Sequence, residues 1–191
     1  RQLSKLYMCG NLGDPIIAKD TLEVFEYFRA HNPNIWLNMH TNGGAREEDW
    51  WKDIAKVFKQ KGDVTFSVDG LEDTNHLYRQ NVQWAKVERS IKAFTGAGGR
   101  ARWDFLIFEH NQHQVEQAKL VAKQWGVEKF VSKKTGRFIS AKSEKKEQHQ
   151  AVNRKGQDTT TLKKPDVKYQ NKELSKYDLL IEKYGSMDSY Y

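Results

Sequence analysis

Short runs of β-type residues alternate with amphipathic helical runs along most of this chain, and this alternation constrains its fold more than any other feature. The unit repeats at about thirty residues, which is typical of βα units that build a parallel sheet. Strands are expected over residues 5–9, 35–39, 64–68, 102–108 and 129–132. The sequence therefore predicts an α/β fold with a parallel sheet.

The segments between these strands carry apolar residues at the spacing of a buried helix face. The stripes are Trp51, Ile54, Ala55 and Phe58, then Trp84, Val87, Ile91 and Phe94, then Val115, Ala118, Ala122 and Trp125. We therefore expect the tryptophans in the core. The expected boundary residues are Asp20 with Glu23 as a capping box, Asn111 as an N-cap, Gly98 and Gly126 as C-caps, and Pro33 as a helix stop.

Length and cysteine content limit the classes of protein to which this chain can belong. At 191 residues and 38% hydrophobic composition, the chain is large enough for one domain with its own core. The single cysteine, Cys9, can form no internal disulfide and cannot alone hold a metal or an iron–sulfur cluster. We expect it to be a small buried side chain. Without an apolar run of about 18 residues or a signal-peptide pattern, we expect a cytoplasmic protein with no membrane partner.

The net charge of +7 is concentrated near the C-terminus, where residues 137–172 hold ten Lys or Arg against four Asp or Glu. We therefore divide the chain into a core over 1–138, a basic flexible linker or tail over 139–172, and a C-terminal helix over 173–191. The helix is expected from the stripe Leu174, Tyr177, Leu180, Ile181 and Tyr184. Because few aromatic residues interleave with the charges, specific nucleic-acid binding is not expected.

Polar and glycine residues follow the first four expected strands, at the edge of a parallel sheet where ligands bind. The segments are Gly10–Pro15, His40–Gly44, Ser67–Gly70 and Glu109–Asn111. Glycines let the backbone approach a ligand closely, and the Asp14 carboxylate can accept hydrogen bonds from an amine. Turn chemistry explains any one of these loops equally well, but four at one edge indicate a site.

The ordered motifs GNLGDP, HTNGG, FSVDG, Tyr78-Arg79 and FEHN resemble those of the radical S-adenosylmethionine (SAM) superfamily, over about residues 6–138. The resemblance implies a partial (βα)6 barrel that binds SAM at its C-terminal edge. In that family a CxxxCxxC loop after the first strand holds a 4Fe–4S cluster. The five strands here would be the second to sixth, and we expect the first βα unit and the cluster cysteines to lie outside this chain.

The resemblance also assigns the SAM-binding residues. The turn Gly10, Gly13, Asp14 and Pro15 resembles the family's glycine-rich turn for the SAM amino group, with Asp14 in place of the usual glutamate. The remaining positions are Thr41 and Asn42, Ser67 and Asp69 near the ribose and carboxylate, Arg79 for the carboxylate, and Asn111 after the next strand. No catalytic residue beyond these is assigned.

By this resemblance the protein cleaves SAM reductively and abstracts a hydrogen atom from a substrate that is left open, with a peptide as one candidate. An electron donor is a further implied partner, and the 191 residues alone are expected to be inactive. Two alternatives stay open. One is a metal-dependent barrel hydrolase with His40, Asp69 and His110 as ligands. The other is a non-enzymatic scaffold whose basic tail binds nucleic acid.

Overall fold

The computed structural model describes residues 3–10, 13–59, 61–138, 146–152 and 157–170. Five parallel strands form one sheet in the order β1-β2-β3-β4-β5, which is also their order along the chain. Their bounds are Lys5–Met8, Trp36–Thr41, Gly62–Ser67, Ala101–Ile107 and Lys129–Lys134. The expected α/β fold with a parallel sheet is confirmed, and β1 forms one open edge because it pairs only with β2 among the described strands.

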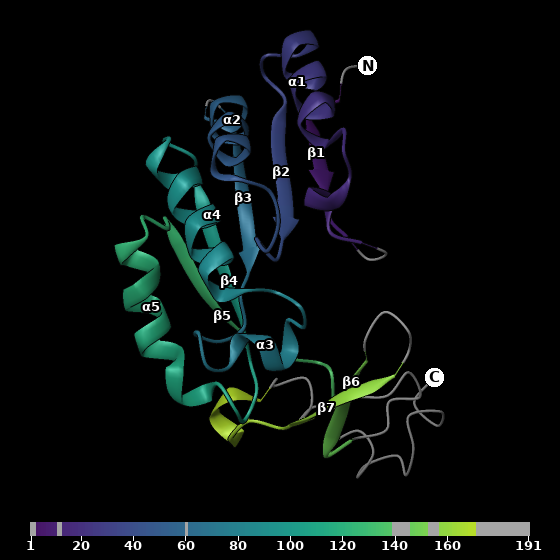
Figure 1. The fold of residues 1–191 in the computed structure, drawn as a ribbon, viewed down its shortest axis with the longest axis vertical. Coiled ribbons are helices and arrows are strands. Elements are labelled where there is room, and N and C mark those ends of the chain that lie inside the picture. Colours follow the sequence, from purple (N-terminus) through teal and green to yellow (C-terminus); the bar gives the residue numbers. More distant parts are fainter. Residues whose placement is uncertain (1–2, 11–12, 60, 139–145, 153–156, 171–191) are drawn as a thin grey trace, which may run out of the picture.

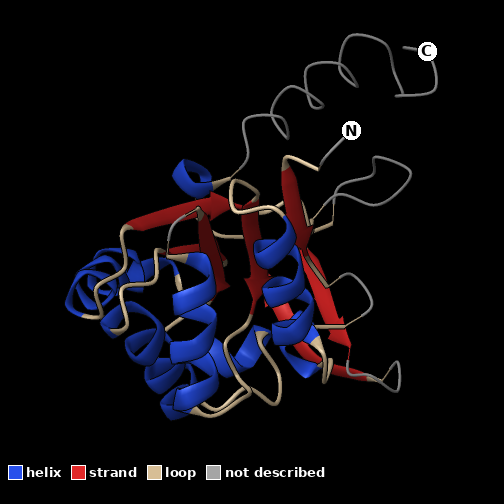
Figure 2. Ribbon diagram, turned by 90° about the horizontal axis from the view of Figure 1, so that it is seen from above, coloured by secondary structure: helices blue, strands red, loops and turns tan. Residues whose placement is uncertain are grey.

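Helices cover one face of this sheet, as Figure 1 and Figure 2 show. The helices are α1 (Thr21–His31), α2 (Glu48–Phe58), α3 (Asn75–Tyr78), α4 (Trp84–Gly96) and α5 (Val115–Gln124), with 3-10 turns η1 (Pro15–Ile17), η2 (Gln112–Gln114) and η3 (Val167–Tyr169). Gly98 and Gly126 follow α4 and α5 with positive φ, as expected of C-caps. No helix in these described ranges is both long and apolar enough to cross a bilayer.

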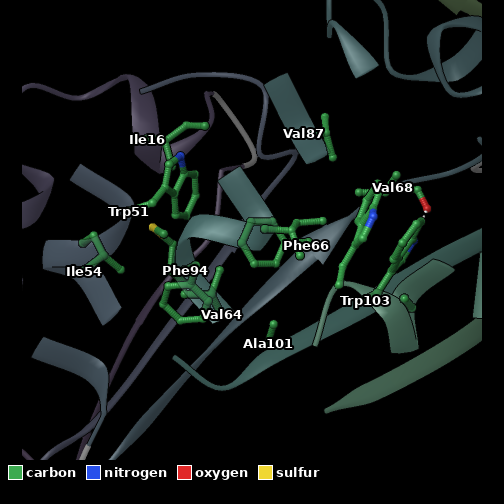
Figure 3. Close-up of a cluster of buried hydrophobic side chains, with 14 of the residues drawn as sticks. Ile16, Trp51, Ile54, Val64, Phe66, Val68, Val87, Phe94, Ala101 and Trp103 are labelled. Carbon is green, nitrogen blue, oxygen red and sulfur yellow. Dashed lines mark hydrogen bonds between the residues drawn. The ribbon is translucent and has the colours of Figure 1, made fainter. Parts of the chain in front are cut away.

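The core lies between the sheet and the helices (Figure 3). Trp51 and Phe94 are fully buried and pack on Phe66 of β3, which confirms that the helical stripes face inward. Trp103 of β4 stacks on Trp125 with ring centroids 5.4 Å apart, and its indole N–H donates to the carbonyl of Val68 at 2.8 Å. The tryptophans Trp51, Trp103 and Trp125 are therefore structural.

Two of the expected helix caps are wrong in their interactions. Asp20 precedes α1 but its side chain makes no capping hydrogen bond; the Thr21 hydroxyl donates instead to the carbonyl of Pro15 at 2.6 Å. Asn111 precedes η2 rather than α5, and its side chain caps neither. Neither Asp20 nor Asn111 therefore accepts a free N–H at the start of its helix.

The basic segment also differs from the flexible linker expected over 139–172. Its described part contains an antiparallel hairpin of β6 (Gln148–Val152) and β7 (Asp158–Lys163), which lies beyond the C-terminal ends of the parallel strands (Figure 1). The hairpin packs because Ala151 and Leu162 are buried against Phe108 and Phe138. The helix expected over 173–191 lies outside the described residues.

Candidate functional site at the C-terminal edge of the sheet

Asp14 joins the loops that follow the first two strands. Its Oδ1 accepts the N–H of Ile16 at 3.2 Å, which caps η1, and its Oδ2 accepts the N–H of Asn42 at 2.7 Å. Each carboxylate oxygen keeps capacity for a further hydrogen bond. Asp14 is therefore held by backbone donors and can still accept from an amine.

The loop after β2 is shaped by two side-chain-to-backbone hydrogen bonds. The Thr41 hydroxyl accepts the N–H of Gly43 at 3.0 Å, and the Asn42 side chain accepts the N–H of Gly44 at 2.8 Å. Gly43 has φ +70°, and a Cβ atom at this position would lie 3.1 Å from the ring of Phe66. The turn therefore needs glycine both for its backbone conformation and for its packing.

Asp69 and Arg79 form an ion pair behind the loop after β3. The Arg79 Nε lies 2.6 Å from the Asp69 Oδ2, and the Asp69 Oδ1 accepts the N–H of Leu106 at 2.6 Å. Asp69 is 1% exposed. Burial raises the pKa of Asp69, while the Arg79 guanidinium and the Leu106 N–H act in the opposite direction. The pair fixes the position of the Arg79 side chain, whose guanidinium reaches the cleft described below.

Asn111 is fully buried and connects the loop after β3 with the end of β4. Its side chain donates to the carbonyls of Asp69 and Leu106, both at 2.9 Å, and accepts the N–H of Phe108 at 2.7 Å. These contacts use the hydrogen-bonding capacity that a ligand would otherwise meet. Asn111 therefore braces the strand ends rather than lining the site.

A cleft of about 300 Å³ lies where these loops meet. Its lining residues are Cys9, Gly10, Gly13, Asp14, His40, Thr41, Asn42, Ser67 and Arg79. The structure thus brings together seven of the ten residues expected to bind SAM. It places Pro15, Asp69 and Asn111 elsewhere: Pro15 opens η1, and the other two are buried behind the cleft.

Cys9 and His40 are cleft residues that the SAM-binding set omitted. Cys9 is exposed, so the expectation of a buried cysteine is wrong. Leu6 and Met8 pack on the core, and side chains alternate along a strand, so Cys9 faces the opposite side with Tyr7. The Tyr7 and His40 rings meet edge to face at 4.9 Å, and burial lowers the pKa of His40. The alternation of side chains along β1, continued by one residue, could have predicted that Cys9 faces away from the core.

The ligand set of the metal-dependent hydrolase is not supported. Within the described ranges, no three His, Cys, Asp or Glu side chains are placed to hold a metal ion. His40 packs on Tyr7, Asp69 binds Arg79, and His110 stacks on the Phe108 ring at 5.5 Å. These three side chains are engaged by separate partners.

Known proteins resemble this chain through structure alone. No family model matches it, and no curated protein does. Streptococcus suis SuiB bound to the precursor peptide SuiA superposes with a TM-score of 0.58 at 15% identity, over 74% of this chain and 31% of that one. The enzyme anSMEcpe with bound S-adenosylmethionine and the Cp18Cys peptide gives 0.55 at 17% identity, over 73% and 40%.

A third similar structure is the radical SAM methyltransferase TsrM from Kitasatospora setae, with cobalamin and a 4Fe–4S cluster bound. It gives a TM-score of 0.52 at 9% identity, over 85% of this chain and 41% of that one. This chain thus spans less than half the length of each of these structures. All three are radical SAM enzymes, and the resemblance seen in the sequence is confirmed at the level of the fold: this chain has the partial-barrel fold of the radical SAM superfamily.

Proposed function

We propose that this chain is the SAM-binding part of a radical SAM enzyme. The observation that carries the proposal is that Asp14 and Arg79 line one small cleft at the C-terminal edge of a parallel sheet. The carboxylate suits the α-amino group of SAM, and the planar guanidinium suits its carboxylate. Ser67 at the end of β3 offers a hydroxyl for the ribose. The described residues therefore fit SAM.

The same residues do not fit a 4Fe–4S cluster, which takes about three or four thiolate ligands. The sequence contains one cysteine. We propose that the cluster ligands come from outside these 191 residues, together with an electron donor. A reduced 4Fe–4S cluster would supply the electron that cleaves bound SAM into methionine and a 5′-deoxyadenosyl radical, and this radical would take a hydrogen atom from the substrate. The role of this chain is to bind and orient SAM. A peptide substrate is favoured by the peptides bound to SuiB and anSMEcpe.

The test compares Asp14→Asn with Asp20→Asn in a protein extended N-terminally to include the cluster cysteines. Both substitutions remove one negative charge, but the Asp20 side chain is exposed and caps nothing. We expect Asp14→Asn to weaken SAM binding by about 10-fold to 100-fold, as for the loss of a charged hydrogen bond. Titration calorimetry gives the affinity, and thermal melting checks that the loops stay folded. Equal SAM affinities for the two folded variants would contradict the assignment of Asp14.

A further inference from the structure

A second, larger cavity lies between the β6–β7 hairpin and the loops at the C-terminal edge of the sheet. Its volume of about 770 Å³ is in the range of ligand sites. Tyr78 and Arg79 line it from the α3 side, and Arg137, His149 and Gln150 line it from the chain that forms the hairpin. The cavity shares Asp14, Asn42 and Arg79 with the smaller cleft, so the two are neighbours.

Two arginines lie beside Tyr78 in the wall of this cavity, and one of them, Arg79, is already paired with Asp69. The Arg79 Cζ lies 5.1 Å from the centre of the Tyr78 ring and the Arg137 Cζ lies 6.0 Å from it. The Arg137 Nε also donates to the Tyr78 hydroxyl at 3.1 Å. The cavity has one lining carboxylate, Asp14, which already accepts two backbone N–H groups.

Arg137 is the cation best placed for a new anionic partner. In the part of the chain that the structure describes, it contacts Tyr78 but no carboxylate. Burial, helped by Arg137 and Lys146, lowers the pKa of His149, so its imidazole is neutral near pH 7 and offers one N–H donor. The cavity wall therefore has spare donors and spare positive charge.

The hairpin meets this cavity at the edge of β6. Three consecutive residues, His149, Gln150 and Ala151, line it. Consecutive side chains point to opposite faces of a strand, so a cavity that touches all three reaches the strand edge. Among the described strands β6 pairs only with β7. Every second residue of such an outer strand directs its N–H and C=O away from the partner strand, where an extended peptide can bind.

We propose that this cavity binds an extended acidic segment of a peptide, with one carboxylate side chain at Arg137 and the peptide backbone along the edge of β6 that faces away from β7. The strand edge and the amides of Gln80 and Gln150 offer both donors and acceptors, which match a peptide better than a free phosphate. Peptide binding at this cavity does not depend on the proposed function. Its interpretation as substrate binding does rest on the proposed function, because the cavity adjoins the SAM cleft.

The test measures binding of two fluorescein-labelled peptides of eight residues, identical except for a central Glu or Gln, by fluorescence anisotropy at 150 mM salt. We expect the Glu peptide to bind the unmodified protein about tenfold more tightly, as for one charged hydrogen bond. Arg137→Gln should remove this preference. Arg89→Gln on the exposed side of α4 removes the same charge at a residue that does not line the cavity and should keep the preference.

Three further measurements, with an N-methylated peptide, with inorganic phosphate and with SAM, separate the explanations. A Glu peptide with N-methylated backbone amides should lose binding, since it cannot pair with a strand edge. Equal binding of the Glu and Gln peptides, equal effects of Arg137→Gln and Arg89→Gln in folded proteins, or tight binding of inorganic phosphate without any peptide preference would each overturn the proposal. SAM affinity is measured on the same samples: peptide preference without SAM binding would leave this inference intact and contradict the proposed function.

Discussion

The turn after β2 requires glycine at position 43, where a φ of +70° and the close approach to Phe66 both disfavour a side chain. We expect Gly43→Ala to lower the free energy of unfolding by about 1–2 kcal/mol, because a left-handed conformation strains any residue with a Cβ atom. Urea denaturation measures the change. Gly96→Ala at the end of α4 is the control: its Cβ would meet nothing within 4 Å, so unfolding free energy should stay equal or rise. Equal losses in both variants would contradict this account.

At the same scale, the sequence could place residues at the sheet edge but could not tell which of them face the cleft. Asp14, Asn42 and Ser67 line it as expected. Asp69 stands in the same kind of loop, yet it is turned inward to bind Arg79 and the N–H of Leu106. Asn111 is likewise taken up by backbone partners. These orientations depend on contacts between loops that are distant in the chain. A local sequence pattern does not predict such contacts.

Among the elements, the β6–β7 hairpin is anchored by one small cluster separate from the main core. Leu162 is 1% exposed and packs with Phe108 and Phe138. We expect Leu162→Ala to cost about 2–5 kcal/mol of packing, as for a buried leucine, and to loosen the hairpin alone. Hydrogen exchange should accelerate in β6 and β7 but not in β3 and β4.

The exposed neighbour Thr161 supplies the control for this prediction, since Thr161→Ala removes a solvent-exposed methyl group and a hydroxyl that donates to Gln150, but no buried packing. It should change exchange in the hairpin far less than Leu162→Ala. Faster exchange in β3 or β4 after Leu162→Ala would show that the hairpin and the sheet unfold as one unit.

Elements with strong periodicity could be predicted, and the hairpin could not. The expected strands of the sheet differ from the observed ones by at most two residues at either end, because their β-type runs stand between clear helical stripes. The hairpin instead presents Ala151 and Leu162 among many Lys, Gln and Thr residues. Two buried side chains are too sparse a pattern to outweigh a composition typical of a solvated tail.

For the molecule as a whole, ligand counting predicts the outcome of cluster assembly. Anaerobic reconstitution of these 191 residues with iron and sulfide should give no stable 4Fe–4S absorption, because one thiolate cannot replace about three. A chain extended to include three cysteines should show that absorption and, with SAM and dithionite, release 5′-deoxyadenosine. The absence of any cluster in the extended chain would contradict the proposed function.

At this scale the parallel order of the strands followed from the repeating βα unit, and the open edge at β1 followed from the expected absence of one unit. The placement of the hairpin beyond the strand ends could not be predicted from this repeat. It depends on contacts such as the hydrogen bond from the Glu109 N–H to the Lys163 carbonyl, at 3.2 Å across more than fifty residues. The second cavity exists only because of that placement.

Cys9 can be used to measure access to the smaller cleft by chemical labelling. Cys9 is exposed, lies in the wall of the smaller cleft and is the single cysteine of these 191 residues, so a thiol-specific label attaches to them at this position without any engineered substitution. The extent of alkylation, read by mass spectrometry, therefore reports directly on how freely reagents reach the cleft. A compound that shields Cys9 binds within reach of Asp14 and Arg79, so compound libraries can be screened before any substrate is known.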